Sequence, residues 1–309
     1  MSLLLWGPIT LRARIVRLGS RWFIKRRSRG LSLAQSREAF RAMVRKAPRP
    51  PRDTETVHVD AGGISADIVT RSASHADRWV FYLHGGGYRI GSPEAYRHFT
   101  WRVADAVHAR VLIIRYRLAP EHPFPAALDD ALAAYRWLLR QGPKEIVGMG
   151  DSAGGGLTLA LLMRLRDEGM RLPDAAAVMS PWTDLALTGA SLEENAAADP
   201  MINAGDMPQA AADYLAGADP CNPYVSPLYG DPAGLPPVLI QVGGDEVLRD
   251  DAVRMADRLS ATNPRSELQV WPLMPHVWQA YAPVMPEARA AIAEIGGFVR
   301  RILGSGDRP

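Results

Sequence analysis

Residues 145–155 read Glu-Ile-Val-Gly-Met-Gly-Asp-Ser-Ala-Gly-Gly. The first half of this stretch is a short apolar run typical of a buried strand, and a long apolar segment typical of a buried helix follows it. A serine between two glycines at such a turn is a nucleophile elbow, which projects the serine hydroxyl from the end of a strand. Alone, Gly-x-Ser-x-Gly is weak evidence, because a glycine-rich turn without any chemistry has the same pattern.

The histidines and acids around Ser152 strengthen the catalytic interpretation. Six of the seven histidines precede the serine, so His276 is the one downstream candidate for a general base. Asp245, in Gly-Gly-Asp-Glu, lies between them and is the predicted acid that orients His276. The order serine, acid, histidine is that of an α/β-hydrolase active site. Three neighbouring acids compete for the acid role: Glu246, Asp250 and Asp251.

A run of glycines, His84-Gly-Gly-Gly87, comes directly after another apolar strand candidate. Successive glycines let the backbone approach a ligand closely and turn its N–H groups toward it. In acyl transfer, one such donor stabilises the developing oxyanion by ~2.7–4 kcal/mol in a well-studied protease. We expect oxyanion donors at Gly85, Gly86 and Ala153, and we expect the His84 ring to bond the loop backbone rather than transfer protons.

From Val57 onward, strand-like runs alternate with helical stretches, which predicts an α/β fold. The central strand candidates are almost continuously apolar, as parallel strands covered on both faces are. We therefore expect an α/β-hydrolase fold, with a mostly parallel eight-stranded sheet, helices on both faces and a helical cap. The expected strands are Thr56–Asp60, Ala66–Thr70, Trp79–Leu83, Val111–Tyr116, Glu145–Met149, Ala176–Met179, Val238–Val242 and Leu268–Trp271. The expected helices are Glu94–Ala109, Ala126–Gln141, Ala153–Glu168, Asp250–Thr262 and Glu287–Leu303.

Two segments interrupt this alternation, and we expect both to contribute to the cap. One is an N-terminal arm over residues 1–50, ending at Pro48-Arg-Pro-Pro51, and the other is an insertion over residues 187–218. The hydrolase core then comprises residues 51–186 and 219–309. Side chains expected to line the substrate pocket are Tyr88, Met201, Tyr214, Val277 and Trp278.

The net charge of +3 conceals a strong asymmetry between the arm and the rest of the chain. Residues 1–52 hold fourteen Lys/Arg and one acid, a charge of +13, so the remainder must carry −10. A basic amphipathic helix at residues 9–27 could bind an anionic membrane surface. Alternatively, and as we favour here, its apolar face packs over the active site while the arginines are solvated. The apolar face is Leu11, Ile15, Leu18 and Trp22, and the basic stripe is Arg14, Arg17, Arg21 and Lys25.

Composition sets outer limits on location and partners. Hydrophobic content of 47% and charged content of 22% are ordinary for a globular protein of 309 residues. No apolar run approaches the ~18 residues of a membrane span. The single cysteine, Cys221, excludes an internal disulfide and fits a reducing compartment. Residues 1–6 lack the charged start and cleavage site of a secretory signal. We expect a cytoplasmic protein that binds no nucleic acid, with peripheral membrane contact through the N-terminal arm as the alternative.

Over about residues 55–303 the chain resembles the bacterial hormone-sensitive-lipase-like carboxylesterases, a branch of the α/β-hydrolase superfamily. The motifs that carry this resemblance are His84-Gly-Gly-Gly87, Tyr116-Arg-Leu-Ala-Pro-Glu-His-Pro-Phe-Pro125, Gly150-Asp-Ser-Ala-Gly-Gly155, Ser180-Pro-Trp-Thr-Asp184, Ser226-Pro-Leu228 and Gly244-Asp-Glu246. The resemblance implies hydrolysis of short- to medium-chain carboxylic esters without metal or cofactor. It also implies the triad Ser152, Asp245 and His276, with oxyanion donors Gly85, Gly86 and Ala153. Many relatives have Gly-Phe where this chain has Val277-Trp278, so we expect an intact triad and an altered pocket wall.

Three functions compete on this sequence. The first is a serine carboxylesterase that forms an acyl-enzyme. A lactone hydrolase would use the same triad with a different pocket. A small-molecule receptor on this fold typically loses the catalytic histidine, and His276 is present. A trypsin-like protease is rejected, because that fold is all-β. The expected partner is a small ester, and a homodimer is possible.

Overall fold

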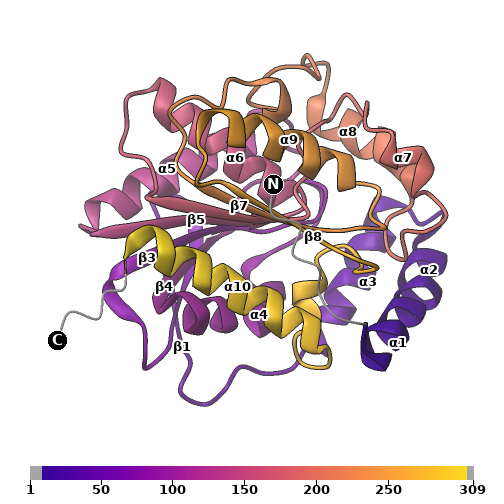
Figure 1. Cartoon of the computed structure of the whole chain (residues 1–309), viewed down its shortest axis with the longest axis horizontal. Coiled ribbons are helices and arrows are strands. Elements are labelled where there is room, and N and C mark those ends of the chain that lie inside the picture. Colours follow the sequence, from indigo (N-terminus) through magenta and orange to yellow (C-terminus); the bar gives the residue numbers. More distant parts are fainter. Residues whose placement is uncertain (1–8, 305–309) are drawn as a thin grey trace.

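The structure, a computed structural model, describes residues 9–304, so the expectation about a secretory signal at residues 1–6 lies outside the described residues. Eight strands form one sheet in the order β1-β2-β4-β3-β5-β6-β7-β8 (Figure 1). β2 is antiparallel to β1 and β4, and all other neighbours are parallel. This confirms the predicted mostly parallel eight-stranded sheet. The strands are β1 Glu55–Asp60, β2 Ser65–Thr70, β3 His75–Leu83, β4 Ala109–Ile114, β5 Glu145–Asp151, β6 Ala175–Met179, β7 Val238–Gly243 and β8 Glu267–Trp271.

Long helices cover both faces of the sheet. One face packs against α4 and α10, through side chains such as Phe99 and Phe298, while the other packs against α5, α6 and α9 (Figure 1). Every residue of β7 is buried, because apolar layers cover that strand on both sides. The five helices are α4 Pro93–Val107, α5 Ala126–Arg140, α6 Ala153–Asp167, α9 Arg249–Thr262 and α10 Pro286–Leu303.

The N-terminal arm is helical and lies on the same side of the molecule as the 187–218 insertion (Figure 1). Lys25 Nζ donates to the backbone oxygens of Ala196 at 2.7 Å and Asp199 at 2.6 Å, so the two segments are in direct contact. The arm contains α1 Leu11–Ser20, a π-helical stretch η1 Arg21–Lys25, α2 Arg26–Ser28 and α3 Leu33–Arg45. The insertion contains α7 Ser191–Glu194, η2 Ala204–Asp206 and α8 Met207–Leu215, and two further 3₁₀ turns follow it, η3 Pro227–Tyr229 and η4 Trp278–Tyr281.

The expectation that the apolar face of the arm packs inward is wrong. Its four residues, Leu11, Ile15, Leu18 and Trp22, are all exposed. Two members of the basic stripe, Arg17 and Lys25, instead point inward and contact the protein, whereas Arg14 and Arg21 are solvent-exposed as expected. Within residues 9–304 no helix is long and apolar enough to cross a membrane.

Candidate active site

Ser152 occupies the sharp turn between β5 and α6. Its φ of +53° and ψ of −125° are strained for a residue with a side chain, which the sequence predicts for a nucleophile elbow. The Ser152 N–H donates to the Met179 oxygen of β6 at 2.9 Å, which fixes the turn to the neighbouring strand. A Cβ atom at Gly154 would collide with the backbone oxygens of Leu83 and His84. Only glycine therefore fits at that position beside β3.

His276, after β8, pairs with the buried carboxylate of Glu246, after β7. The distance from His276 Nδ1 to Glu246 Oε2 is 2.7 Å. Burial lowers the pKa of His276, but the charge and hydrogen bond of Glu246 raise it by more, so the pKa lies above its usual 6.5. With Nδ1 turned to the carboxylate, Nε2 has no hydrogen-bond partner among the described residues. That nitrogen is the atom a general base needs.

Asp245, the expected acid, is not the partner of His276. Its carboxylate instead forms an ion pair with Arg17 of α1. Adjacent side chains of this turn point in different directions: Glu246 is fully buried, whereas Asp245 is partly exposed and faces the N-terminal arm. The sequence offered both acids as candidates, and the structure brings together His276 and Glu246.

Ser180, directly after β6, connects the three loops. Its Oγ donates to Glu246 Oε1 at 2.7 Å and accepts from the Val277 N–H at 3.1 Å. The preceding residue, Met179, accepts the Ser152 N–H. These contacts hold the serine, acid and histidine loops at one edge of the sheet. Sequence reasoning singled out the Ser180–Asp184 motif but assigned this serine no role.

The oxyanion loop differs from expectation at Gly85. Its N–H donates to Tyr96 Oη at 2.9 Å and to Asp151 Oδ1 at 3.1 Å, so it is not free to bind an oxyanion. Asp151 is buried and also accepts hydrogen bonds from Tyr82 and Tyr96. Burial raises the pKa of Asp151 although these hydrogen bonds oppose the shift. The expectation that Gly85 is an oxyanion donor is therefore wrong, because its N–H binds Asp151 at the end of β5.

Three other N–H groups near the elbow remain available. The N–H groups of Gly86, Gly87 and Ala153 make no hydrogen bond within residues 9–304. Gly86 and Gly87 have φ values of +118° and +60°, in the region that favours glycine. Ala153 is the first residue of α6, where backbone N–H groups lack intrahelical partners and favour negative charge.

His84 contacts the loop backbone, as expected. Its Nδ1 lies 2.9 Å from the Gly85 oxygen, and its ring stacks on Tyr116 with centroids 4.2 Å apart. Burial lowers the pKa of His84 to about 4, so the ring is neutral near neutral pH.

Comparison with known proteins shows the family to which this chain belongs. A family model described as the α/β-hydrolase fold matches residues 80–280. The acetyl-hydrolase of Streptomyces hygroscopicus is 47% identical over 83% of this chain and 85% of its own length. The putative acetyl-hydrolase LipR of Mycobacterium tuberculosis is 36% identical, over 88% of this chain and 89% of its own. An esterase crystal structure from the bacterial hormone-sensitive lipase family superimposes with a TM-score of 0.90 at 41% identity, over 96% of this chain and 100% of that one.

The chain belongs to the bacterial hormone-sensitive-lipase-like carboxylesterases. It is a carboxylic ester hydrolase with an α/β-hydrolase fold. The resemblance inferred from its motifs is confirmed.

In this esterase, the expected pocket residues have varied surroundings. Tyr88 and Tyr214 are buried and stack on each other with ring centroids 3.7 Å apart. Met201 Sδ lies 3.6 Å from the Tyr281 hydroxyl. Trp278 packs in the core beside Trp271 on the α4 and α10 side of the sheet. The expectation that Trp278 lines the substrate pocket is therefore wrong, because its large, mostly apolar ring is fully buried in the core between the sheet and the helices α4 and α10.

Asp199 of the insertion fastens that segment to the acid loop of the esterase. Its carboxylate is fully buried and accepts from the Val247 N–H at 3.0 Å and from the Met201 N–H at 2.7 Å. Val247 directly follows Glu246, so the insertion helps to fix the backbone beside the carboxylate that contacts His276.

Proposed function

We propose that this esterase hydrolyses short-chain carboxylic esters through an acyl-enzyme on Ser152, with His276 as general base and Glu246 as its acid partner. The observation that carries the proposal is the buried His276–Glu246 contact of 2.7 Å. The position of this pair supports the proposal. Ser180, directly after β6, contacts both the acid loop and the base loop, and Met179 at the end of β6 accepts the Ser152 N–H.

In the first half-reaction, His276 Nε2 takes the Ser152 proton while Ser152 Oγ attacks the ester carbonyl carbon. Glu246 keeps the proton of the imidazole on Nδ1 and stabilises the imidazolium that forms. The carbonyl oxygen becomes an oxyanion, which the N–H groups of Gly86, Gly87 and Ala153 would receive. When the bond to the alcohol breaks, His276 returns the proton to the leaving oxygen and the acyl group stays on Ser152.

In the second half-reaction, His276 takes a proton from water, whose oxygen attacks the acyl carbon. The same donors stabilise the second oxyanion, and the proton then passes from His276 to Ser152 as the acid leaves. Asp151 acts as a positioning residue in this scheme. It holds the Gly85 backbone next to the Ser152 turn, and this contact orients the N–H groups of Gly86 and Gly87 toward the oxyanion.

We infer that the arm and the insertion together cap this site. The contacts of Lys25 with residues 196 and 199 support this inference, and the Arg17–Asp245 ion pair joins the arm to the acid loop. In α3, Arg37 Nη1 lies 2.6 Å from Glu121 Oε1, which supports a structural rather than catalytic role for that glutamate.

The names of two relatives support short acyl chains, since one is named an acetyl-hydrolase and the other a putative acetyl-hydrolase. We expect kcat/KM for p-nitrophenyl esters to be highest between acetate and hexanoate. Palmitate should be hydrolysed at least about ten-fold less efficiently, because a fitted apolar pocket discriminates by at least that factor. A lactone panel measured in parallel tests the second candidate. Preference for palmitate would contradict the short-chain proposal, and preference for lactones would replace the substrate class while keeping the triad.

The acid limb of the pH profile follows from the environment of His276. Only the neutral imidazole accepts the Ser152 proton, so kcat/KM falls as the pH drops through the pKa of His276. Because Glu246 raises that pKa, the midpoint of the acid limb is expected above 6.5. A pH-stat assay on ethyl butyrate measures this without a pH-dependent chromophore. A midpoint below 6.5 would mean that the base is not paired with a carboxylate.

A further inference from the structure

The continuous helix from Leu11 to Ser28 has its small and polar residues on the inner side. Ala13 and Ser20 are buried, and Arg17 Nη2 donates to the Ala198 oxygen at 3.3 Å. A helix that only covers a core normally turns its large apolar residues inward. Here Val16 is half-buried against the core, but five large apolar residues point outward, with exposed fractions of 73% for Leu11, 59% for Ile15, 59% for Leu18, 58% for Trp22 and 66% for Phe23.

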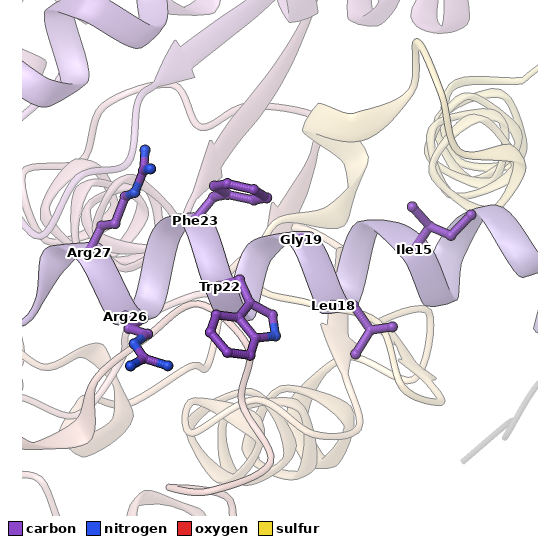
Figure 2. Close-up of a pocket in the computed structure, with 7 residues that line it drawn as sticks. All are labelled: Ile15, Leu18, Gly19, Trp22, Phe23, Arg26 and Arg27. Carbon is purple, nitrogen blue, oxygen red and sulfur yellow. The ribbon is translucent and has the colours of Figure 1, made fainter.

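These outer residues form one continuous surface, which we call the outer face. Leu18 and Trp22 flank one side of a shallow groove and Ile15 and Phe23 the other, with Gly19 between them (Figure 2). The groove ends at two arginines that lie over the aromatic rings: Arg26 is 4.8 Å from the centroid of Trp22, and Arg27 is 5.3 Å from that of Phe23. Large exposed apolar patches of this kind mark interaction surfaces.

The charge around the outer face indicates what it binds. Residues 11–28 contain no acid, and no exposed arginine of this helix pairs with a carboxylate within residues 9–304. These exposed arginines are Arg12, Arg14, Arg21, Arg26 and Arg27. Aliphatic and aromatic side chains surrounded by arginines are the composition of helices that lie in the interface of an anionic membrane.

We propose that the outer face docks on an anionic phospholipid bilayer. A symmetric dimer through the same face would bring the arginines of two copies together, which like charges oppose. Nucleic acid would use the arginines but not the apolar groove. Because Arg17 of this helix contacts Asp245, beside Glu246, docking places the acid loop about one helix diameter, ~10 Å, from the lipid. This proposal does not depend on the triad assignment.

The test is co-sedimentation of the full chain with vesicles of phosphatidylcholine alone or mixed equally with phosphatidylglycerol. We expect binding to the anionic vesicles only, and weaker binding when salt rises from roughly 0.1 M to roughly 1 M, which shortens the screening length from about 10 Å to about 3 Å. Leu18→Ser with Trp22→Ser should weaken binding at least about ten-fold. So should Arg14→Gln with Arg21→Gln, since each arginine near an anionic surface contributes about five-fold.

The matched control is Val57→Ser, which removes an exposed apolar side chain from the edge strand β1 rather than from the helix and should bind like the parent. Thermal melting checks that all variants fold, which we expect because the altered side chains are exposed. Absence of binding to anionic vesicles would overturn the proposal, as would unchanged binding by the Leu18/Trp22 variant. Light scattering adds one further outcome: a parent dimer that this variant converts to a monomer, without vesicle binding, would assign the outer face to a second copy and likewise overturn it.

Discussion

Replacing Ser152 with alanine is expected to lower kcat for p-nitrophenyl butyrate by about 10⁵–10⁶-fold, the loss seen when a serine nucleophile is removed. The substitution removes the oxygen that forms the acyl-enzyme, and no other group in the scheme can replace it. Residual hydrolysis should still exceed that in water, because the N–H donors of the oxyanion loop remain. Steady-state kinetics measures the loss, and a thermal melt shows that the fold is retained.

Ser180→Ala is the matched control for this experiment. Both serines follow adjacent parallel strands and both have positive φ, +53° at Ser152 and +48° at Ser180. Without the Ser180 hydroxyl, Glu246 Oε1 still accepts from the Gly243 N–H at 2.6 Å. We expect roughly a ten- to hundred-fold loss of kcat/KM, since the Ser180 hydroxyl makes two hydrogen bonds, each worth on the order of 1 kcal/mol. If Ser180→Ala were the more damaging change, the assignment of the nucleophile would be wrong.

The sheet could be predicted from sequence because its central strands are buried on both faces and therefore read as apolar runs. Most predicted boundaries lie within two residues of those observed. The largest difference is at β3, which begins at His75 rather than Trp79. Its first three residues, His75 to Asp77, are exposed and include one apolar side chain, and the pairing with β4 shifts register between His75 and Trp79. Hydrophobic periodicity gives no signal for such a strand end.

The order of the catalytic candidates along the chain could be predicted from sequence, but the direction in which each side chain points could not. Asp245 and Glu246 are adjacent carboxylates, and only the conformation of the turn after β7 decides which one faces His276. Gly85 similarly belongs to the expected loop, yet its N–H is taken by Asp151, a contact between distant residues. The orientation of the arm could not be predicted for a similar reason. An apolar stripe predicts an amphipathic helix, but it does not tell which face of the helix packs against the protein.

Glu246→Gln is expected to lower kcat/KM by about 10³–10⁴-fold, as removal of the carboxylate does in serine hydrolases with this triad logic. Glutamine keeps the size of the side chain but removes the charge that stabilises the imidazolium of His276. Since that charge also raises the pKa of His276, the acid limb of the residual activity should move to lower pH. A purely structural role for Glu246 would not move the acid limb.

The adjacent substitution Asp245→Asn separates the two acids. It breaks a partly exposed ion pair with Arg17, and such pairs contribute about 0–1 kcal/mol. Arg17 also retains contacts with the Ala198 and Leu273 oxygens, so the arm stays anchored. We expect kcat/KM to remain within about five-fold of the parent, the factor to which 1 kcal/mol corresponds. The triad would have to be reassigned to Asp245 if the Asn variant lost activity on the scale expected for Glu246→Gln while the Gln variant did not. Both variants remove one negative charge from the same turn, so a large loss confined to Glu246→Gln is assigned to the contact with His276 rather than to charge removal alone.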